Sequence, residues 1–136
     1  MKRPANAKAR KTLPTNAELA ILNALWELTE ATVDDVVARL PSNPPANYKT
    51  VQSLLRIMEN KRFVRHTVRG RAFVFSPRVT RDEVSGSLTK NLLDRTFQGS
   101  ASALMMNLLD SNHVNKKELD ALEALIQGYR ERKSKD

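Results

Sequence analysis

A chain of 136 residues with 40% hydrophobic and 5% aromatic side chains has the length of one moderate domain, or of one small domain with an appended module. No apolar run approaches the ~18 residues of a membrane span, and the basic N-terminus lacks the apolar segment of a secretory signal. Because the sequence has no cysteine, it excludes disulfides, thiolate metal sites and a cysteine nucleophile, and we expect a cytoplasmic protein without membrane association.

The net charge of +8 is unevenly distributed along the chain. Residues 1–12 carry five Lys or Arg and no acid, and residues 61–78 carry six and no acid, whereas residues 79–136 carry nine of each sign. Such local basicity indicates a polyanionic partner, with the neutral C-terminal half serving another purpose. Residues 1–12 lack periodicity and predict a flexible basic tail, either merely solvated or a non-specific phosphate-binding arm.

Two helices are predicted after this tail. The first covers residues 16–28, because Thr15 and Glu18 form a capping-box signature in front of a broad apolar face. The second covers residues 33–40, with Thr32 as its N-cap and two aspartates in its first turn, where the helix dipole favours anions. The prolines that follow end the helical pattern before a third helix begins.

The predicted third helix, Tyr48–Asn60, carries two stripes with opposite properties. Its apolar stripe has the helical spacing i, i+3, i+4 and i+7 and consists of Val51, Leu54, Leu55 and Met58. The same spacing on the far side, roughly 160° away, gives a polar stripe of Lys49, Gln52, Ser53 and Arg56. Cations, an amide and a hydroxyl can reach base edges and phosphates in a DNA groove, although a solvated surface explains the stripe equally well in isolation.

After the third helix the period changes to that of strands. Residues 63–68 and 72–76 predict a hairpin around Arg69-Gly70-Arg71, a tip that can approach a phosphate backbone closely. Three helices followed by a basic hairpin are the order of a winged helix-turn-helix domain, which we place at residues 13–78. The polar stripe of the third helix is then expected to enter the major groove, with Arg69 and Arg71 of the wing on phosphates.

Residues 79–136 predict three further amphipathic helices. Thr80 with Glu83 and Asn115 with Glu118 mark two helix starts, and Ser100 marks another. Helices this short bury too little apolar surface to form a core alone, so we interpret the segment as a homodimerisation module. The alternative is that it packs onto its own winged domain. The predicted fold is therefore mostly α with a small β wing.

Enzymatic chemistry finds little support in the sequence. Residues 87–90 fit the S-x-x-K nucleophile signature, but its companions S-D-N and K-T-G are absent and the segment has an apolar stripe instead. His66 and His113 are far apart and without metal-ligand spacing, and we expect His66 to face phosphate or solvent. With four glycines there is no phosphate-cradling loop. We predict no enzyme, no metal site and no cofactor.

Taken together, these segments resemble the penicillinase-repressor family, the BlaI/MecI/CopY group of bacterial winged-helix repressors. The resemblance runs from about residue 13 to residue 129. It depends on five segments in the right order: AELAILNALWEL, YKTVQSLLRIMENKRFV, RAFVFSPRVTRDEV, LLDRTFQGSASALMMNLLD and KKELDALEALI.

The resemblance implies a homodimer that binds double-stranded DNA at a palindromic operator and represses transcription. The positions that match the family's recognition helix are Lys49, Thr50, Gln52, Ser53 and Arg56. In β-lactam-responsive members, an antibiotic-sensing membrane protein leads to proteolysis of the repressor in its dimerisation module. The matching bond here is Asn107–Leu108, and its cleavage would weaken the paired grip on two half-sites.

Two departures from the family pattern stand out. The family often has Lys-Gly at the end of the recognition helix, where this chain has Lys61-Arg62, so the helix end is expected to differ. Copper-responsive members carry C-terminal cysteine motifs, which this chain lacks, so copper sensing through such motifs is excluded.

Two other functions compete with the repressor. A non-specific architectural or adaptor protein would use the winged domain only as a surface for an anionic or protein partner. A repressor with a small-molecule effector ranks lower, because no polar-lined pocket can be read from the sequence.

Overall fold

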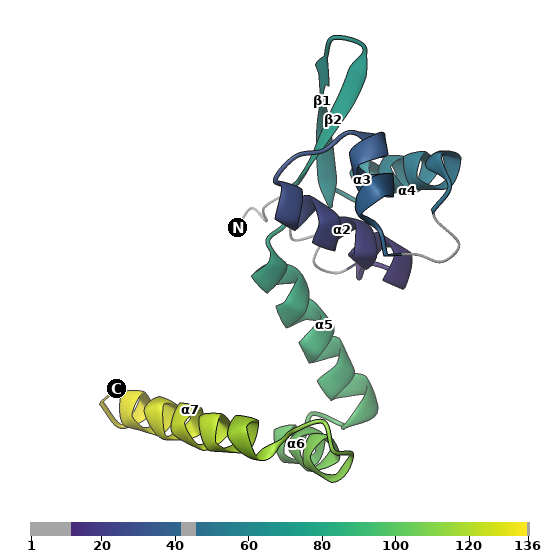
Figure 1. The fold of residues 1–136 in the computed structure, drawn as a ribbon. Coiled ribbons are helices and arrows are strands. Elements are labelled where there is room, and N and C mark those ends of the chain that lie inside the picture. The colour runs from purple at the N-terminus through teal and green to yellow at the C-terminus, as the bar shows by residue number, and fades with distance from the viewer. Residues whose placement is uncertain (1–11, 42–45, 136) are drawn as a thin grey trace, which may run out of the picture. The chain divides into compact units, whose positions relative to one another are not determined.

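The computed structural model describes residues 12–41 and 46–135. Its backbone contacts divide the chain into two compact units, the first ending at Lys90 and the second beginning at Asn91. The predicted basic tail, apart from its last residue, lies outside the described residues. The first unit contains three helices and a hairpin, and Figure 1 shows the helices α2, α3 and α4 gathered at the base of the hairpin.

The helices of the first unit begin where their capping residues predict. They are α2 (Asn16–Leu28), α3 (Val33–Arg39) and α4 (Tyr48–Asn60), and only the C-terminal end of α3 differs, by one residue, from the sequence prediction. Thr15 and Thr32 form complete capping boxes, with Glu18 and Asp35 as their partners. Such caps satisfy backbone N–H groups that a helix leaves without partners, typically worth about 1 kcal/mol each.

The wing is an antiparallel pair of strands, β1 (Val64–Arg69) and β2 (Ala72–Pro77), paired from Val64↔Pro77 to Arg69↔Ala72. Its loop is Gly70-Arg71, and Gly70 has a φ of 63°, the left-handed value that a type II′ hairpin turn requires of its first residue. Ala31, between α2 and α3, exchanges two backbone hydrogen bonds of 2.8 and 2.9 Å with Phe75 of β2. The wing is therefore attached at its base to the turn between the first two helices.

One hydrophobic core joins these elements. It is formed by the inward faces of the three helices and the base of the wing, and its largest fully buried members are Phe63, Ile21, Leu22, Leu25, Leu55 and Met58. Burying a side chain of this size stabilises the fold by roughly 1.5–3 kcal/mol relative to exposure. The core thus fixes α4 by its apolar stripe and leaves the opposite stripe outside. The predicted fold class, a winged helix-turn-helix domain in a mostly α chain, is confirmed.

The end of α4 keeps the geometry that a glycine would normally provide. Arg62 has a φ of 69°, so it occupies the left-handed position after the C-cap. Two backbone hydrogen bonds of a Schellman motif close the helix there, from Phe63 N–H to the Met58 carbonyl (2.9 Å) and from Arg62 N–H to the Glu59 carbonyl (3.0 Å). The expectation that Lys61-Arg62 changes the helix end is therefore wrong, because these bonds and the buried Phe63 impose the turn.

The helix α5 (Arg81–Thr96) starts as part of the winged unit. Val79 and Val84 are buried in its core, and Leu88 packs against it. Trp26 donates its indole N–H to the Val79 carbonyl at 2.9 Å, and the Arg81 guanidinium lies 4.9 Å from the centre of the Trp26 ring. Residues 79–90, which the sequence analysis assigned to the C-terminal module, therefore belong to the first compact unit.

The second unit contains the end of α5, α6 (Ala101–Asp110) and α7 (Lys116–Lys135). Ser100 caps α6 through the Ala103 N–H (3.1 Å), and Asn115 caps α7 through the Glu118 N–H (2.8 Å). No residue between 91 and 134 is buried, and α6 and α7 do not pack along each other. The side chains that would form a core in this unit are exposed, among them Leu92, Met106, Leu125, Ile126 and Tyr129.

Candidate nucleic-acid interface

The polar stripe of α4 is exposed along its whole length. Lys49, Thr50, Gln52, Ser53 and Arg56 are all exposed, whereas Val51, Leu55 and Met58 on the opposite side are buried. Asn47 fixes the start of the helix by accepting hydrogen bonds from the backbone N–H groups of Lys49 (2.7 Å) and Thr50 (3.4 Å). The structure therefore presents the five predicted recognition residues together on one helix, rigidly held from behind by the core.

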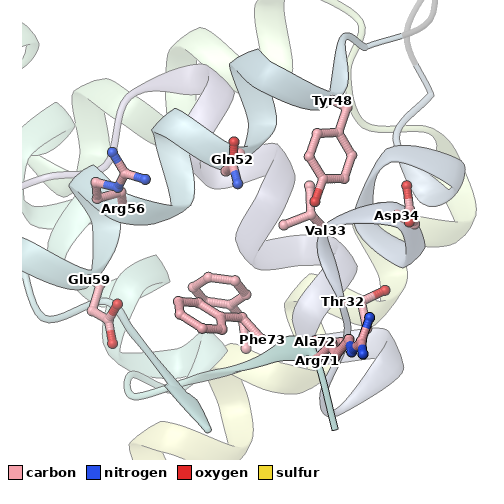
Figure 2. A pocket seen from close by; sticks show the side chains of 11 residues that line it. Thr32, Val33, Asp34, Tyr48, Gln52, Arg56, Glu59, Arg71, Ala72 and Phe73 are labelled. Atoms are coloured by element: carbon pink, nitrogen blue, oxygen red, sulfur yellow. The ribbon is translucent and has the colours of Figure 1, made fainter. Parts of the chain in front are cut away.

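Between α4 and the wing lies an open pocket of about 410 Å³. Figure 2 shows Gln52 and Arg56 facing it from α4, while Arg71 and Phe73 border it from the wing. The remaining lining residues come from the start of α3, from the two ends of α4 and from β2. Of the predicted site residues, the pocket brings together Gln52, Arg56 and Arg71, whereas Lys49, Thr50, Ser53 and Arg69 do not line it.

The wing is also fixed to the last turn of α4 by a carboxylate. Glu59 accepts a hydrogen bond from the His66 backbone N–H (3.2 Å), and its carboxylate lies 2.7 Å from His66 Nδ1. The imidazole stacks on Phe73, with 4.1 Å between the ring centres. From the sequence, His66 is expected to face phosphate or solvent, but in the structure His66 joins α4 to the wing. Phe73 is 49% exposed and borders the pocket.

The two arginines of the wing tip have different surroundings. Arg71 is exposed, borders the pocket and has no ion pair among the residues that the structure describes. Arg69 instead donates two hydrogen bonds to the Glu30 carboxylate, one of them from Nη2 to Oε1 at 2.9 Å. The guanidinium, mainly through these hydrogen bonds and also through its charge, holds the pKa of the Glu30 carboxyl below its usual value. Glu30 therefore stays ionised at neutral pH.

Lys61, a second cation of the acid-free run at residues 61–78, is also paired with an acid from another part of the chain. Lys61 Nζ lies 3.1 and 2.9 Å from the two carboxylate oxygens of Glu18, which is 2% exposed. The sequence analysis missed the roles of Glu18, Glu30 and Glu59, because each acts on a residue that only the fold brings near. Glu18 had a visible local signal, its capping box, but nothing in the pattern links it to Lys61.

The predicted cleavage site lies inside a helix. Asn107 is exposed and Leu108 half-buried, both within α6, and the Asn107 carbonyl accepts hydrogen bonds from Ser111 N–H (3.1 Å) and Oγ (2.6 Å). Proteases act on locally opened backbone, so cutting this bond requires local opening of α6. Among the described residues, no group of three or more His, Asp or Glu side chains is placed to hold a metal ion. Within the same residues, no helix is long and apolar enough to cross a membrane.

Three helices, a wing and an exposed cationic stripe on the third helix define the class of winged-helix DNA-binding proteins. A family model described as penicillinase repressor matches residues 14–128, which is most of the chain. The protein therefore belongs to the penicillinase repressor family, a family of DNA-binding transcriptional repressors, as the resemblance of its sequence predicts.

Individual relatives are more distant. A penicillinase repressor of Bacillus licheniformis is 22% identical over 119 residues, which cover 88% of this chain and 93% of that protein. Among solved structures, a CopR repressor is 32% identical and covers 51% of this chain and 100% of its own, with a TM-score of 0.43. The DNA-binding domain of the repressor BlaI is 24% identical and covers 53% of this chain and 90% of its own, with a TM-score of 0.46.

Proposed function

We propose that the protein is a homodimeric transcriptional repressor in the cytoplasm that reads a palindromic operator with two copies of α4. The observation that carries the proposal is that Gln52 and Arg56 of α4 and Arg71 of the wing border the same open pocket. In the major groove, an arginine can form a bidentate contact with guanine and a glutamine with adenine. Arg71 at the wing tip is suited to a phosphate, which positions the helix without reading sequence.

Dimerisation is supported by the C-terminal unit, in which every apolar side chain is at least partly exposed. Met106, Leu125 and Tyr129 are each more than half exposed in a single chain. Apolar surface of this extent on a small helical unit indicates a protein partner, and a second copy is the simplest. Two winged units held together would reach half-sites about 34 Å apart, or a small multiple of that distance.

The regulated genes and the inducing signal belong to a further hypothesis. Family membership supports repression of β-lactam-resistance genes and inactivation by a sensor-linked protease that cleaves Asn107–Leu108 in α6. Cleavage there would remove α7 and with it much of the exposed apolar surface. Treating the producing cells with a β-lactam and following the chain by immunoblot tests this: a fragment ending at Asn107 is expected, and a helix-compatible Asn107→Ala variant that is not cut should abolish induction.

The experiment that tests DNA recognition compares specific and random duplexes. Fragments bound from the host genome are selected first, and affinities for the selected duplex and for a random one are then measured by fluorescence anisotropy. We expect Gln52→Ala and Arg56→Ala to lose roughly 1–3 kcal/mol on the selected duplex at particular base pairs, and much less on the random one. Equal losses on both would show that α4 does not read sequence and would favour the architectural alternative.

The C-terminal unit needs its own measurement. Sedimentation of the full chain should give a dimer, and a chain that ends at Asn107 should sediment mainly as a monomer with a folded winged unit. Thr50→Ala and Ser53→Ala, on the same exposed surface of α4, serve as controls that leave the oligomeric state unchanged. A truncated chain that remained fully dimeric would contradict the assignment of dimerisation to α7 and the end of α6.

A further inference from the structure

Arg69 and Arg71 lie on either side of the wing-tip glycine, yet only one of them has its charge satisfied within the chain. Both terminal nitrogens of Arg69 donate to the Glu30 carboxylate, in a bidentate arrangement that favours arginine. Arg71 has no such acid among the described residues. The Arg69–Glu30 pair has no net charge, and it offers a phosphate fewer donors than an unpaired arginine does. The two wing arginines are therefore not equivalent toward DNA.

Glu30 is well placed to hold Arg69, because its own backbone is anchored. The following residue, Ala31, is buried and exchanges two backbone hydrogen bonds with Phe75 of β2. The carboxylate therefore projects from a segment fixed to the wing's base, while Arg69 stands at the end of β1 near the wing's tip. The ion pair therefore links the turn between α2 and α3 to the end of β1 at the wing tip. Both side chains are exposed, so removal of the Glu30 carboxylate would leave the Arg69 guanidinium free to reach a phosphate.

We propose that Glu30 sets the strength of DNA binding by withholding Arg69 from DNA phosphates, so that Arg71 alone supplies the wing-tip phosphate contact. The inference deepens the proposed function and rests on the protein binding DNA through α4 and the wing. Phosphate contacts add affinity for every sequence alike, whereas base contacts favour the operator. Glu30 thereby lowers the affinity for operator and random DNA by a similar factor, without touching a base and without changing the ratio between them.

The salt dependence of binding counts the phosphates that a protein neutralises, with a slope of about 0.9 per contact on duplex DNA. The test measures this slope from 50 to 300 mM KCl, on a fluorescein-labelled random 30-base-pair duplex, for a double-mutant cycle. The variants are Glu30→Gln, Arg69→Gln and the two combined, each in the full-length chain. Arg71→Gln is measured in both the wild-type and the Glu30→Gln backgrounds, and thermal unfolding checks that every variant folds.

If Glu30 withholds Arg69, Arg69→Gln leaves the slope unchanged in the wild-type background but lowers it by about 0.9 in the Glu30→Gln background. Glu30→Gln alone raises the slope by a similar amount and tightens random-duplex binding about five- to tenfold at 0.1 M salt. A simple effect of net charge would instead make Arg69→Gln equally costly in both backgrounds. That result would overturn the proposal, because it would mean that Arg69 contacts phosphate despite Glu30.

The failure of this inference and the failure of the proposed function give different results. Arg71→Gln should lower the slope by about 0.9 in both backgrounds, because its contact does not depend on Glu30. If Arg71→Gln changed nothing and Arg56→Ala also left the affinity for the selected duplex unchanged, the DNA interface itself would be misplaced. If Arg71→Gln behaved as expected while the two Arg69→Gln effects were equal, only the role of Glu30 would be wrong.

Discussion

The two units of this chain differ in how far they bury their apolar residues. The winged unit encloses a core with fully buried members such as Leu22, Leu25 and Leu55. The C-terminal unit also has helices with an apolar face, but none of its residues from 91 to 134 is buried. Periodicity alone therefore does not separate a helix whose apolar face is covered within its own chain from one whose apolar face stays exposed. What separates them is the presence of other elements that cover the apolar face.

The largest expected effect comes from truncating one leucine in each of the two units. Leu55→Ala should destabilise the winged unit by about 2–5 kcal/mol, because it removes a fully buried side chain and leaves a cavity. Urea denaturation followed by Trp26 fluorescence measures the loss, since this tryptophan packs against the core and donates to Val79. The loss should not depend on protein concentration.

Leu125→Ala is the matched variant in the other unit, where this side chain is 56% exposed in a single chain. If α7 is covered by a second copy, the truncation should weaken the dimer and act in a concentration-dependent way. A loss of under about 0.5 kcal/mol at every concentration would indicate an ordinary surface residue, and would mean that no partner covers this face of α7.

The second prediction concerns how the winged unit is held together internally. Lys61→Met keeps the length of the side chain but leaves the buried Glu18 carboxylate without its cation. Breaking a buried pair by removing one partner costs about 3–5 kcal/mol, and we expect roughly 2–3 here because the lysine end is partly exposed. Chemical denaturation at pH 7 measures it, with the exposed Arg78→Met as control. Equal stability of the two variants would mean that Glu18 needs no cation.

The smallest expected effect has the opposite sign. Arg62→Gly should stabilise the winged unit by about 0.5–1 kcal/mol, because a glycine tolerates the left-handed φ of 69° without strain. Thermal unfolding should show a rise in Tm of a few degrees. Lys49→Gly, at a helical position in the first turn of α4, is the control and should destabilise. A lower Tm for Arg62→Gly would show that the arginine side chain stabilises the winged unit by more than its strained backbone destabilises it.

Most of the fold follows from local signals in the sequence. Thr15, Thr32, Asn47, Ser100 and Asn115 all cap helices, because a cap and its partner lie within three residues of each other. The exposed stripe of α4 was equally predictable, since helical periodicity fixes which side chains share a face.

The electrostatic contacts of the site could not be predicted, because they join distant segments. Glu18 and Lys61 are 43 positions apart, and Glu30 and Arg69 are 39 apart. In the sequence the run from residue 61 to residue 78 is free of acids, and in the fold two of its cations already have carboxylate partners. Charge counted along a chain therefore overstates the charge that the folded surface offers to DNA.

The Glu18 carboxylate also has a kinetic consequence. It accepts from the Thr15 backbone N–H at 2.9 Å in the first turn of α2 and binds Lys61 at the end of α4. Opening the first turn of the first helix or the last turn of the recognition helix alone therefore breaks the Glu18–Lys61 ion pair. Amide protons in these two turns should exchange with solvent in a single correlated event, slower than the fraying of an ordinary helix end. The opening of the last turn of the recognition helix is thereby coupled to Glu18, which lies 43 positions from Lys61 in the sequence.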